Sequence, residues 1–358
     1  MNSFAFIIHP IDPKRDVSRK FPFLGRVVPE PLIHFLSRFF PPVYLSEVEG
    51  IYSLSTGEGT KGWLIACPLT AARMLELPER IVYKKIIQTG RLAERLGADI
   101  LGLGAFTSVI GDGGLTVARA LDIPVTTGDA YTIAVAVQST LKAAQAFQID
   151  LSQATAAVVG ASGAIGQVCA EMLAEQVAEL YLISRKQKRL EQLKHELAPR
   201  TPARLVTSTE LADLSKAEVI LTVSSAIEAI IQPEHLRPGS VICDVARPRD
   251  VSAQVAARRN DVFVFDGGIL DVPGEANFNF DFGFPPGKAY ACMAETIALA
   301  LEGRLEDYTL GKNISRARVD EITAIAQKHG FQISGFRSFE RPVTTEQIEQ
   351  IRIHARKK

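Results

Sequence analysis

Three glycines at positions 160, 163 and 166 constrain the fold of this chain more than any other feature. They directly follow an apolar run at residues 154–159 and open a segment with the apolar periodicity of a helix. In a tight strand-to-helix turn, a residue without Cβ lets backbone N–H groups approach a phosphate, whose charge the helix N-terminus stabilises. The third glycine lets the helix pack closely on the sheet. This order predicts a dinucleotide site in a parallel α/β sheet; a purely structural glycine turn is the alternative.

The end of the next predicted strand, at residues 180–184, indicates which dinucleotide is bound. Ser184, Arg185 and Lys186 stand where an NAD-preferring site usually presents a carboxylate, and a hydroxyl followed by two cations suits a 2′-phosphate. We therefore expect NADPH, the alternative being that these cations form only the solvated start of the next helix. The predicted cofactor-binding residues are Gly160, Ser162, Gly163, Ala164, Ile165, Gly166, Ser184, Arg185, Lys186 and Ser224, the last at the end of a further predicted strand.

Strand and helix patterns alternate along the middle of the chain. Further strands are predicted at residues 218–223, 240–245 and 262–266, and helices end near residues 176 and 197. The predicted fold class is α/β: a Rossmann-like doubly wound parallel sheet with a separate N-terminal α/β substrate domain and a helical C-terminal region. The expected domains are residues 1–149 for substrate, 150–284 for the cofactor, and 285–358 for the helical region, which begins at a Pro- and Gly-rich boundary.

Composition narrows the classes of partner. The 358 residues carry 40 Lys and Arg against 40 Asp and Glu, so no net charge favours nucleic acid as a partner. The four cysteines lack the close pairing of a zinc site or a disulfide scaffold, so we expect no metal and reduced thiols in the cytoplasm. Residues 1–9 are patterned as a strand rather than a signal peptide.

An apolar, Phe-rich segment at residues 31–40 ends at two prolines. A segment of this kind is more often a helix buried in its own domain, and this is the interpretation we favour. The alternative is that its bulk lies against a membrane surface or an acyl chain, as a peripheral contact.

Cys292 is the most interesting thiol, because it falls in the first turn of a helix that is predicted to begin just after Gly287. A helix N-terminus stabilises a thiolate, and Lys288 adds positive potential, so we expect an acidic, nucleophilic thiol. The alternative is a small buried hydrophobe. Cys67 is a rival because it ends a strand next to a turn, whereas Cys169 and Cys243 are predicted to be structural.

Four segments together resemble the long-chain acyl-[acyl-carrier-protein] reductases of cyanobacteria. They are residues 104–108 (GAFTS), 126–132 (TTGDAYT), 157–166 (AVVGASGAIG) and 290–295 (YACMAE). The resemblance covers most of the chain. It implies NADPH-dependent reduction of fatty acyl thioesters to fatty aldehydes, with Cys292 carrying the acyl group. It further implies acyl-carrier protein or acyl-coenzyme A as the substrate carrier and an aldehyde-consuming enzyme as a partner.

The matching loops supply candidates for contact with the substrate or with a tetrahedral oxyanion. These candidates are Thr107, Ser108, Thr127 and Tyr131, the last at a position where the family has His. Hydroxyl groups before a helix also serve as ordinary caps. Two other functions stay open: a shikimate- or amino-acid-type dehydrogenase that acts without covalent catalysis, and a non-catalytic NADPH-responsive binding protein.

Overall fold

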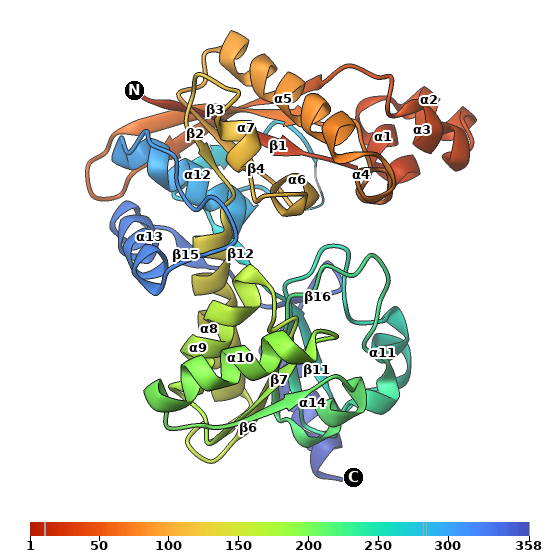
Figure 1. Cartoon of the computed structure of the whole chain (residues 1–358), viewed down its shortest axis with the longest axis vertical. Helices are drawn as coiled ribbons and strands as arrows, with labels where there is room; N and C mark the ends of the chain where they lie inside the picture. Colours follow the sequence, from red (N-terminus) through yellow and green to blue (C-terminus); the bar gives the residue numbers. More distant parts are fainter. Residues whose placement is uncertain (11, 282, 284, 358) are drawn as a thin grey trace. The chain divides into compact units, whose positions relative to one another are not determined.

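The computed structural model describes residues 1–10, 12–281, 283 and 285–357 (Figure 1). Two compact units make up the chain, and each is discontinuous in sequence. The first unit comprises Met1–Tyr131 and Leu270–Gln332, and the second comprises Thr132–Ile269 and Ile333–Lys358. This division differs from three consecutive domains, because residues 270–332 return to pack within the first unit. The expected boundary at residue 284 lies outside the described residues.

The first unit is built on a mixed six-stranded sheet with the order β13-β2-β3-β1-β4-β5. Four strands run parallel: β1 (Ser3–Ile8), β3 (Gly59–Ala66), β4 (Ile100–Leu103) and β5 (Val125–Thr126). Two strands run antiparallel to their neighbours: β2 (Val43–Tyr52) and β13 (Gly274–Asn277). The carboxyl ends of the parallel strands therefore meet at one edge of the sheet, which is where open α/β sheets bind ligands.

Helices cover both faces of this sheet. Consecutive residues of β4 point to opposite faces and contact a different helix on each. Leu101 lies on the face of α5 (Glu79–Leu96), where its side chain is close to Gly90. Gly102 points to the other face, where a Cβ would overlap the hydroxyl of Thr296 on α12 (Ala291–Glu302). The absence of a side chain at Gly102 thus lets α12 approach the sheet closely.

Shorter elements complete the first unit. The helices are α1 (Pro13–Lys20), α2 (Pro22–Val27), α3 (Glu30–Leu36), α4 (Ala71–Glu76), α6 (Phe106–Val109), α7 (Leu115–Ala118) and α13 (Arg316–His329). Three short strands are β12 (Ile269–Asp271), β14 (Lys288–Tyr290) and β15 (Gln332–Ile333).

The second unit contains a six-stranded sheet with the order β11-β10-β9-β6-β7-β8, in which every pair is parallel. The strands are β6 (Thr155–Val159), β7 (Glu179–Ile183), β8 (Arg204–Ser208), β9 (Val219–Thr222), β10 (Val241–Asp244) and β11 (Phe263–Asp266). Counted from β6, this is the doubly wound order 3-2-1-4-5-6, and the strand order reverses between β6 and β9. The predicted fold class is confirmed. The five predicted strands agree with β6, β7, β9, β10 and β11 to within a residue or two at either end, whereas β8 was not predicted.

The α-helices of the second unit include the two that the sequence pattern predicted to end near residues 176 and 197. The α-helices are α8 (Asp129–Ala146), whose first turn belongs to the first unit, α9 (Ala164–Ala174), α10 (Gln187–Leu197), α11 (Ala253–Arg258) and α14 (Thr345–Arg356). A small hairpin of β16 (Arg337–Ser338) and β17 (Arg341–Pro342) lies in the same unit. Among the described residues, no helix combines the length and apolar character needed to cross a bilayer.

The prediction that the Phe-rich segment forms a buried helix is wrong. No residue of α3 is buried, and the exposed fractions of Phe35 and Phe39 are 53% and 62%. Polar contacts help to attach this segment to its unit and leave these rings outward. His34 Nδ1 lies 3.0 Å from Thr70 Oγ1, and Lys85 donates to the carbonyl of residue 40 at 2.7 Å.

Candidate functional site

The glycine turn has the geometry that a dinucleotide requires. Gly160 has a φ of +86°, and a Cβ there would lie 2.8 Å from the carbonyl oxygen of Val223. A Cβ on Gly166 would overlap the carbonyl oxygen of Gly160. No side chain caps α9 at Gly163 within the described residues, so the helix N-terminus keeps N–H groups for a phosphate. Both the turn and the close packing of α9 therefore depend on glycine.

The residues after β7 lie next to this turn. Ser184 Oγ is 2.5 Å from Ser162 Oγ and accepts the backbone N–H of Lys186 at 3.2 Å. Arg185 and Lys186 are exposed. No carboxylate occupies positions 184–186, so two cations follow the hydroxyl at the point where a ribose is expected. This arrangement fits a ribose that carries a 2′-phosphate.

Ser224 lies across the point where the strand order reverses. Its Cα would be 3.1 Å from a Cβ on Gly160, so the loop after β9 borders the glycine turn. Its hydroxyl donates to Asp250 at 2.5 Å, and its backbone N–H donates to the same carboxylate at 2.9 Å. Because Asp250 fixes this hydroxyl, Ser224 shapes the edge of the candidate cofactor site. The uncapped N–H groups at the start of α9 and the tight glycine turn before them fit a dinucleotide in the second unit.

Cys292 is the second residue of α12, in the first unit, and so lies in the first turn of a helix as predicted. The helix begins later than expected, at Ala291, because Lys288–Tyr290 form β14. The backbone of Cys292 lies directly against Gly128, where φ is +76° and a Cβ would overlap the cysteine. Gly128 joins β5 to α8. The N-termini of α8 and α12 are therefore in contact at the thiol.

The expectation of an acidic thiol is wrong. Burial, together with the carboxyl groups of Asp129 and Glu295, raises the pKa of Cys292 to about 12, although the N–H of Met293 acts in the opposite direction. Lys288, which was expected to add positive potential, is paired with Asp271. Near neutral pH the sulfur therefore holds its proton, and attack on a substrate requires a base.

Two carboxyl groups lie beside the thiol: that of Glu295 is buried and that of Asp129 is half-buried. Burial, and then repulsion by Glu295, raises the pKa of Asp129 to about 8. Glu295 follows Cys292 by one helical turn, and burial raises its pKa as well. It accepts the hydroxyl of Thr126 at 2.5 Å and the N–H of Tyr131 at 2.8 Å. Glu295 thus holds the first turn of α8 against α12, and Asp129 is left with a pKa suited to proton transfer near neutral pH.

The predicted substrate-contacting residues follow β4 and β5 at the carboxyl edge of the first sheet: Thr107 and Ser108 in α6, and Thr127 and Tyr131 before and in the first turn of α8. Thr107 and Ser108 donate to the carbonyls of Gly104 and Ala105, each at 2.7 Å. Thr127 donates to the carbonyl of residue 309 at 2.5 Å. Tyr131 is buried, and its ring meets that of Phe331 edge-on. Of the four, Thr127 and Tyr131 flank the segment that contacts Cys292, whereas the hydroxyls of Thr107 and Ser108 close a turn of α6.

The remaining thiols are buried. Burial raises the pKa of Cys67 to about 11 and that of Cys243 to about 12, and raises the pKa of Cys169 as well. Only Cys292 among the four is partly accessible. This difference favours it over Cys67 as a site for chemistry.

Sequence reasoning missed both carboxyl groups of the site, and also His9. A signal for Glu295 existed, because it is a charged residue in the middle of the apolar helix that begins at Ala291 and lies on the same face as Cys292. Asp129 stands at the start of a helix, where a carboxylate usually serves only as a cap. His9 is buried at the end of β1 and accepts the N–H of Phe106 through Nε2 at 3.1 Å, and burial lowers its pKa. No local pattern marks that contact.

A family of known dehydrogenases matches the region that the sequence predicted to bind the cofactor. Residues 141–267 match the family described as shikimate / quinate 5-dehydrogenase. The chain is 29% identical over 311 residues to a long-chain acyl-[acyl-carrier-protein] reductase from Synechococcus elongatus, covering 82% of this chain and 87% of that protein.

A second relative is much longer than this chain. The chain is 30% identical over 291 residues to the aminotransferase PigE from Serratia sp., covering 80% of this chain but only 34% of PigE. The chain thus spans about a third of that protein. Among solved structures, L-tryptophan dehydrogenase from Nostoc punctiforme aligns with 99% of this chain and 88% of its own, at 12% identity and a TM-score of 0.44. The family match at residues 141–267 and the doubly wound sheet support an oxidoreductase with a nicotinamide cofactor.

Proposed function

We propose that this chain reduces fatty acyl thioesters to fatty aldehydes with NADPH, through an acyl group carried on Cys292. The observation that carries the proposal is the partly accessible thiol at the start of α12 with the Asp129 carboxyl group beside it. The similarity to an acyl-carrier-protein reductase over most of both chains supports the substrate class. The carrier is an acyl-carrier protein or coenzyme A, and the aldehyde passes to a consuming enzyme.

Proton transfer is the part of this reaction that the described residues explain. The carboxylate of Asp129 accepts the thiol proton as the sulfur of Cys292 bonds to the acyl carbon. The bond between that carbon and the carrier sulfur then breaks, and Asp129 returns the proton to the departing thiolate. Glu295 holds the first turn of α8, and therefore Asp129, in place. When bound, NADPH would supply the hydride that turns the acyl group into an aldehyde and frees the cysteine.

The test is the mass of the intact protein after mixing with a long-chain acyl thioester without NADPH. We expect one acyl increment on the native protein and on Cys67→Ala, and none on Cys292→Ala. Adding NADPH should remove the increment as aldehyde appears, and Cys292→Ala should still bind NADPH. An acyl adduct on Cys292→Ala, or unchanged aldehyde formation by it, would contradict the proposal.

A dehydrogenase without a covalent step is the second candidate, because the family match at residues 141–267 carries that description. Such an enzyme would form no adduct with a thioester and would keep its activity in Cys292→Ala. A protein that only senses NADPH would bind the cofactor without any turnover. Adduct mass and activity, measured on the native protein, Cys67→Ala and Cys292→Ala, therefore separate all three functions.

A further inference from the structure

The segment of residues 12–40 exposes apolar side chains to an extent that the other described residues do not. Five phenylalanines with exposed side chains occur in the described residues, and all lie here: Phe21, Phe23, Phe35, Phe39 and Phe40. The exposed fraction reaches 75% at Phe23. Val27 and Leu32 are also exposed in the same segment. Isolated exposed apolar residues are ordinary on proteins, but a group of seven within twenty residues indicates a binding surface.

These seven side chains are exposed, while polar contacts help to attach the segment to its unit. Besides the contacts of His34 and Lys85, Lys20 donates to the carbonyl of Leu45 at 2.7 Å. Within the segment, α1 and α2 meet closely at Gly25, where a Cβ would overlap Ser18. Phe35 and Phe39 contact each other edge-on, with ring centres 5.9 Å apart. The helices therefore form an ordered surface with its apolar side outward.

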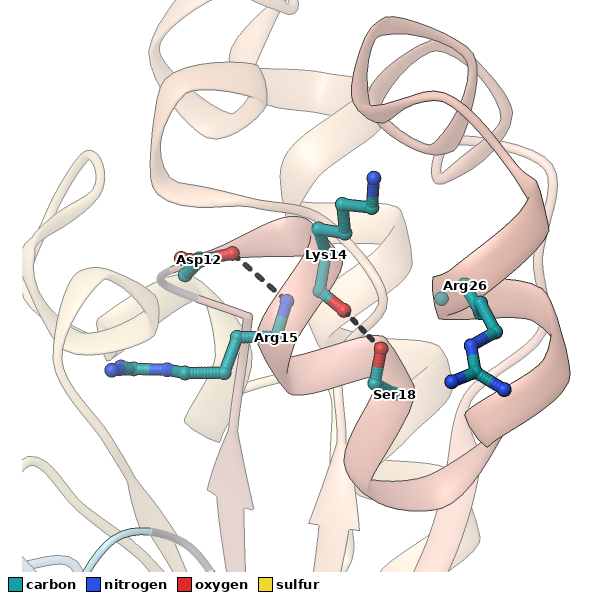
Figure 2. Close-up of a pocket in the computed structure, with 6 residues that line it drawn as sticks. Asp12, Lys14, Arg15, Ser18 and Arg26 are labelled. Carbon is teal, nitrogen blue, oxygen red and sulfur yellow. Dashed lines mark hydrogen bonds between the residues drawn. The ribbon is translucent and has the colours of Figure 1, made fainter.

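Basic groups accompany the apolar ones. Residues 12–40 carry six Lys and Arg against three Asp and Glu, whereas the chain as a whole is neutral. An open pocket of about 480 Å³ lies between α1 and α2, and Figure 2 shows cationic side chains from both helices around it. Its lining consists of Asp12, Lys14, Arg15, Ser18, Gly25 and Arg26. Such a pocket suits the phosphate of a lipid headgroup.

We propose that this segment binds an anionic membrane surface. Phe23 and Phe39 insert at the boundary between headgroups and acyl chains, and Lys14 and Arg26 contact lipid phosphates. An acidic carrier protein would also be attracted by the cations, but water-exposed phenylalanines on protruding short helices fit the interior of a lipid interface better than a hydrated acidic protein. The proposal does not depend on the reaction at Cys292.

The test is flotation with vesicles of phosphatidylcholine containing about 30 mol % phosphatidylglycerol, compared with pure phosphatidylcholine. The full chain should float with the anionic vesicles, and salt should weaken the association. At about fivefold for each cation lost, K14E/R26E should lower the partition coefficient by at least about 30-fold. F23S/F39S should also release the protein from the vesicles.

Matched controls lie outside the segment. Ile227→Ser combined with Leu305→Ser removes two exposed apolar side chains, and Arg258→Glu reverses an exposed charge on α11; both variants should float like the native protein. Circular dichroism checks that every variant is folded. The proposal would be overturned if the native protein failed to float with the anionic vesicles, or if the segment variants floated as the native protein does. A K14E/R26E variant whose only defect is a raised KM for a carrier-bound thioester would also overturn it, because the segment would then dock the carrier protein.

Discussion

The thiol of Cys292 shows how position along a helix and burial act in opposite directions. The start of α12 favours a thiolate, yet burial and two neighbouring carboxyl groups raise the pKa of Cys292 to about 12. The resulting need for a base gives Asp129 its role in the proposed reaction. The sequence could identify the cysteine from its place in the helix, but not the burial that reverses the expected acidity.

Asp129 should set the pH dependence of acylation. The pKa of Asp129, about 8, lies above the ordinary value of 3.8. Below pH 8 the ionised fraction of Asp129 therefore rises about tenfold per pH unit, and above pH 8 the group is ionised. Single-turnover acylation by the native protein should rise in the same way and then level off. Asp129→Asn should lose this rise and be slower by about 10²- to 10⁴-fold.

Two comparisons check that assignment. Asp122→Asn changes an exposed carboxyl group and should leave the pH profile as it is. Because folded Asp129 holds its proton more tightly than the unfolded chain, native stability should fall as pH rises from about 4 to about 8, and Asp129→Asn should lack that fall. A native rate that is independent of pH between about 6 and 8 would rule out Asp129 as the base.

Arg185 should determine the preference for NADPH over NADH. A charge-assisted contact with the 2′-phosphate is worth about 1.5–3 kcal/mol, so Arg185→Ala should reduce the ratio of the two affinities by at least about tenfold. Titration of both cofactors measures the change. Lys188→Ala removes an exposed cation from the first turn of α10, the helix that follows Arg185, and is the matched control. An unaltered preference in Arg185→Ala would show that these cations serve only as the solvated helix start.

The contact between the first turns of α8 and α12 is the element on which the candidate site depends. Gly128 stands at that contact with a positive φ, and only glycine leaves room for the backbone of Cys292. Strands and helices around it could be predicted because their apolar periodicity is local. The contact itself joins residues more than 150 positions apart, so no periodicity reports it.

Gly128→Ala should therefore lower both stability and acylation. The positive φ alone costs about 1 kcal/mol, and the overlap with Cys292 adds about 1–3 kcal/mol more. Gly57→Ala is the matched control, since its φ is +71° and no atom would lie within 4 Å of the new Cβ. Chemical denaturation measures both variants. Equal losses in the two would mean that the close packing at Cys292 contributes nothing.

At the scale of the whole molecule, neutral net charge conceals a basic, apolar segment at residues 12–40. Averages over the chain gave no reason to expect it, and the Phe-rich pattern alone was interpreted as a buried helix. What decides the matter is the direction of the side chains. His34 faces Thr70 while Phe35 and Phe39 face outward, and this follows from how α3 is attached to the unit.

The sequence by itself determined the doubly wound sheet, the glycine turn, the cations after β7 and the place of Cys292 in its helix. Each of these depends on residues close together in the chain, whose spacing and backbone freedom carry the information. Only the tertiary structure decided that residues 270–332 join the first unit, that Glu295 holds α8, and that Asp129 stands beside a thiol of raised pKa. Those features arise from burial and from contacts between distant segments, which local patterns do not encode.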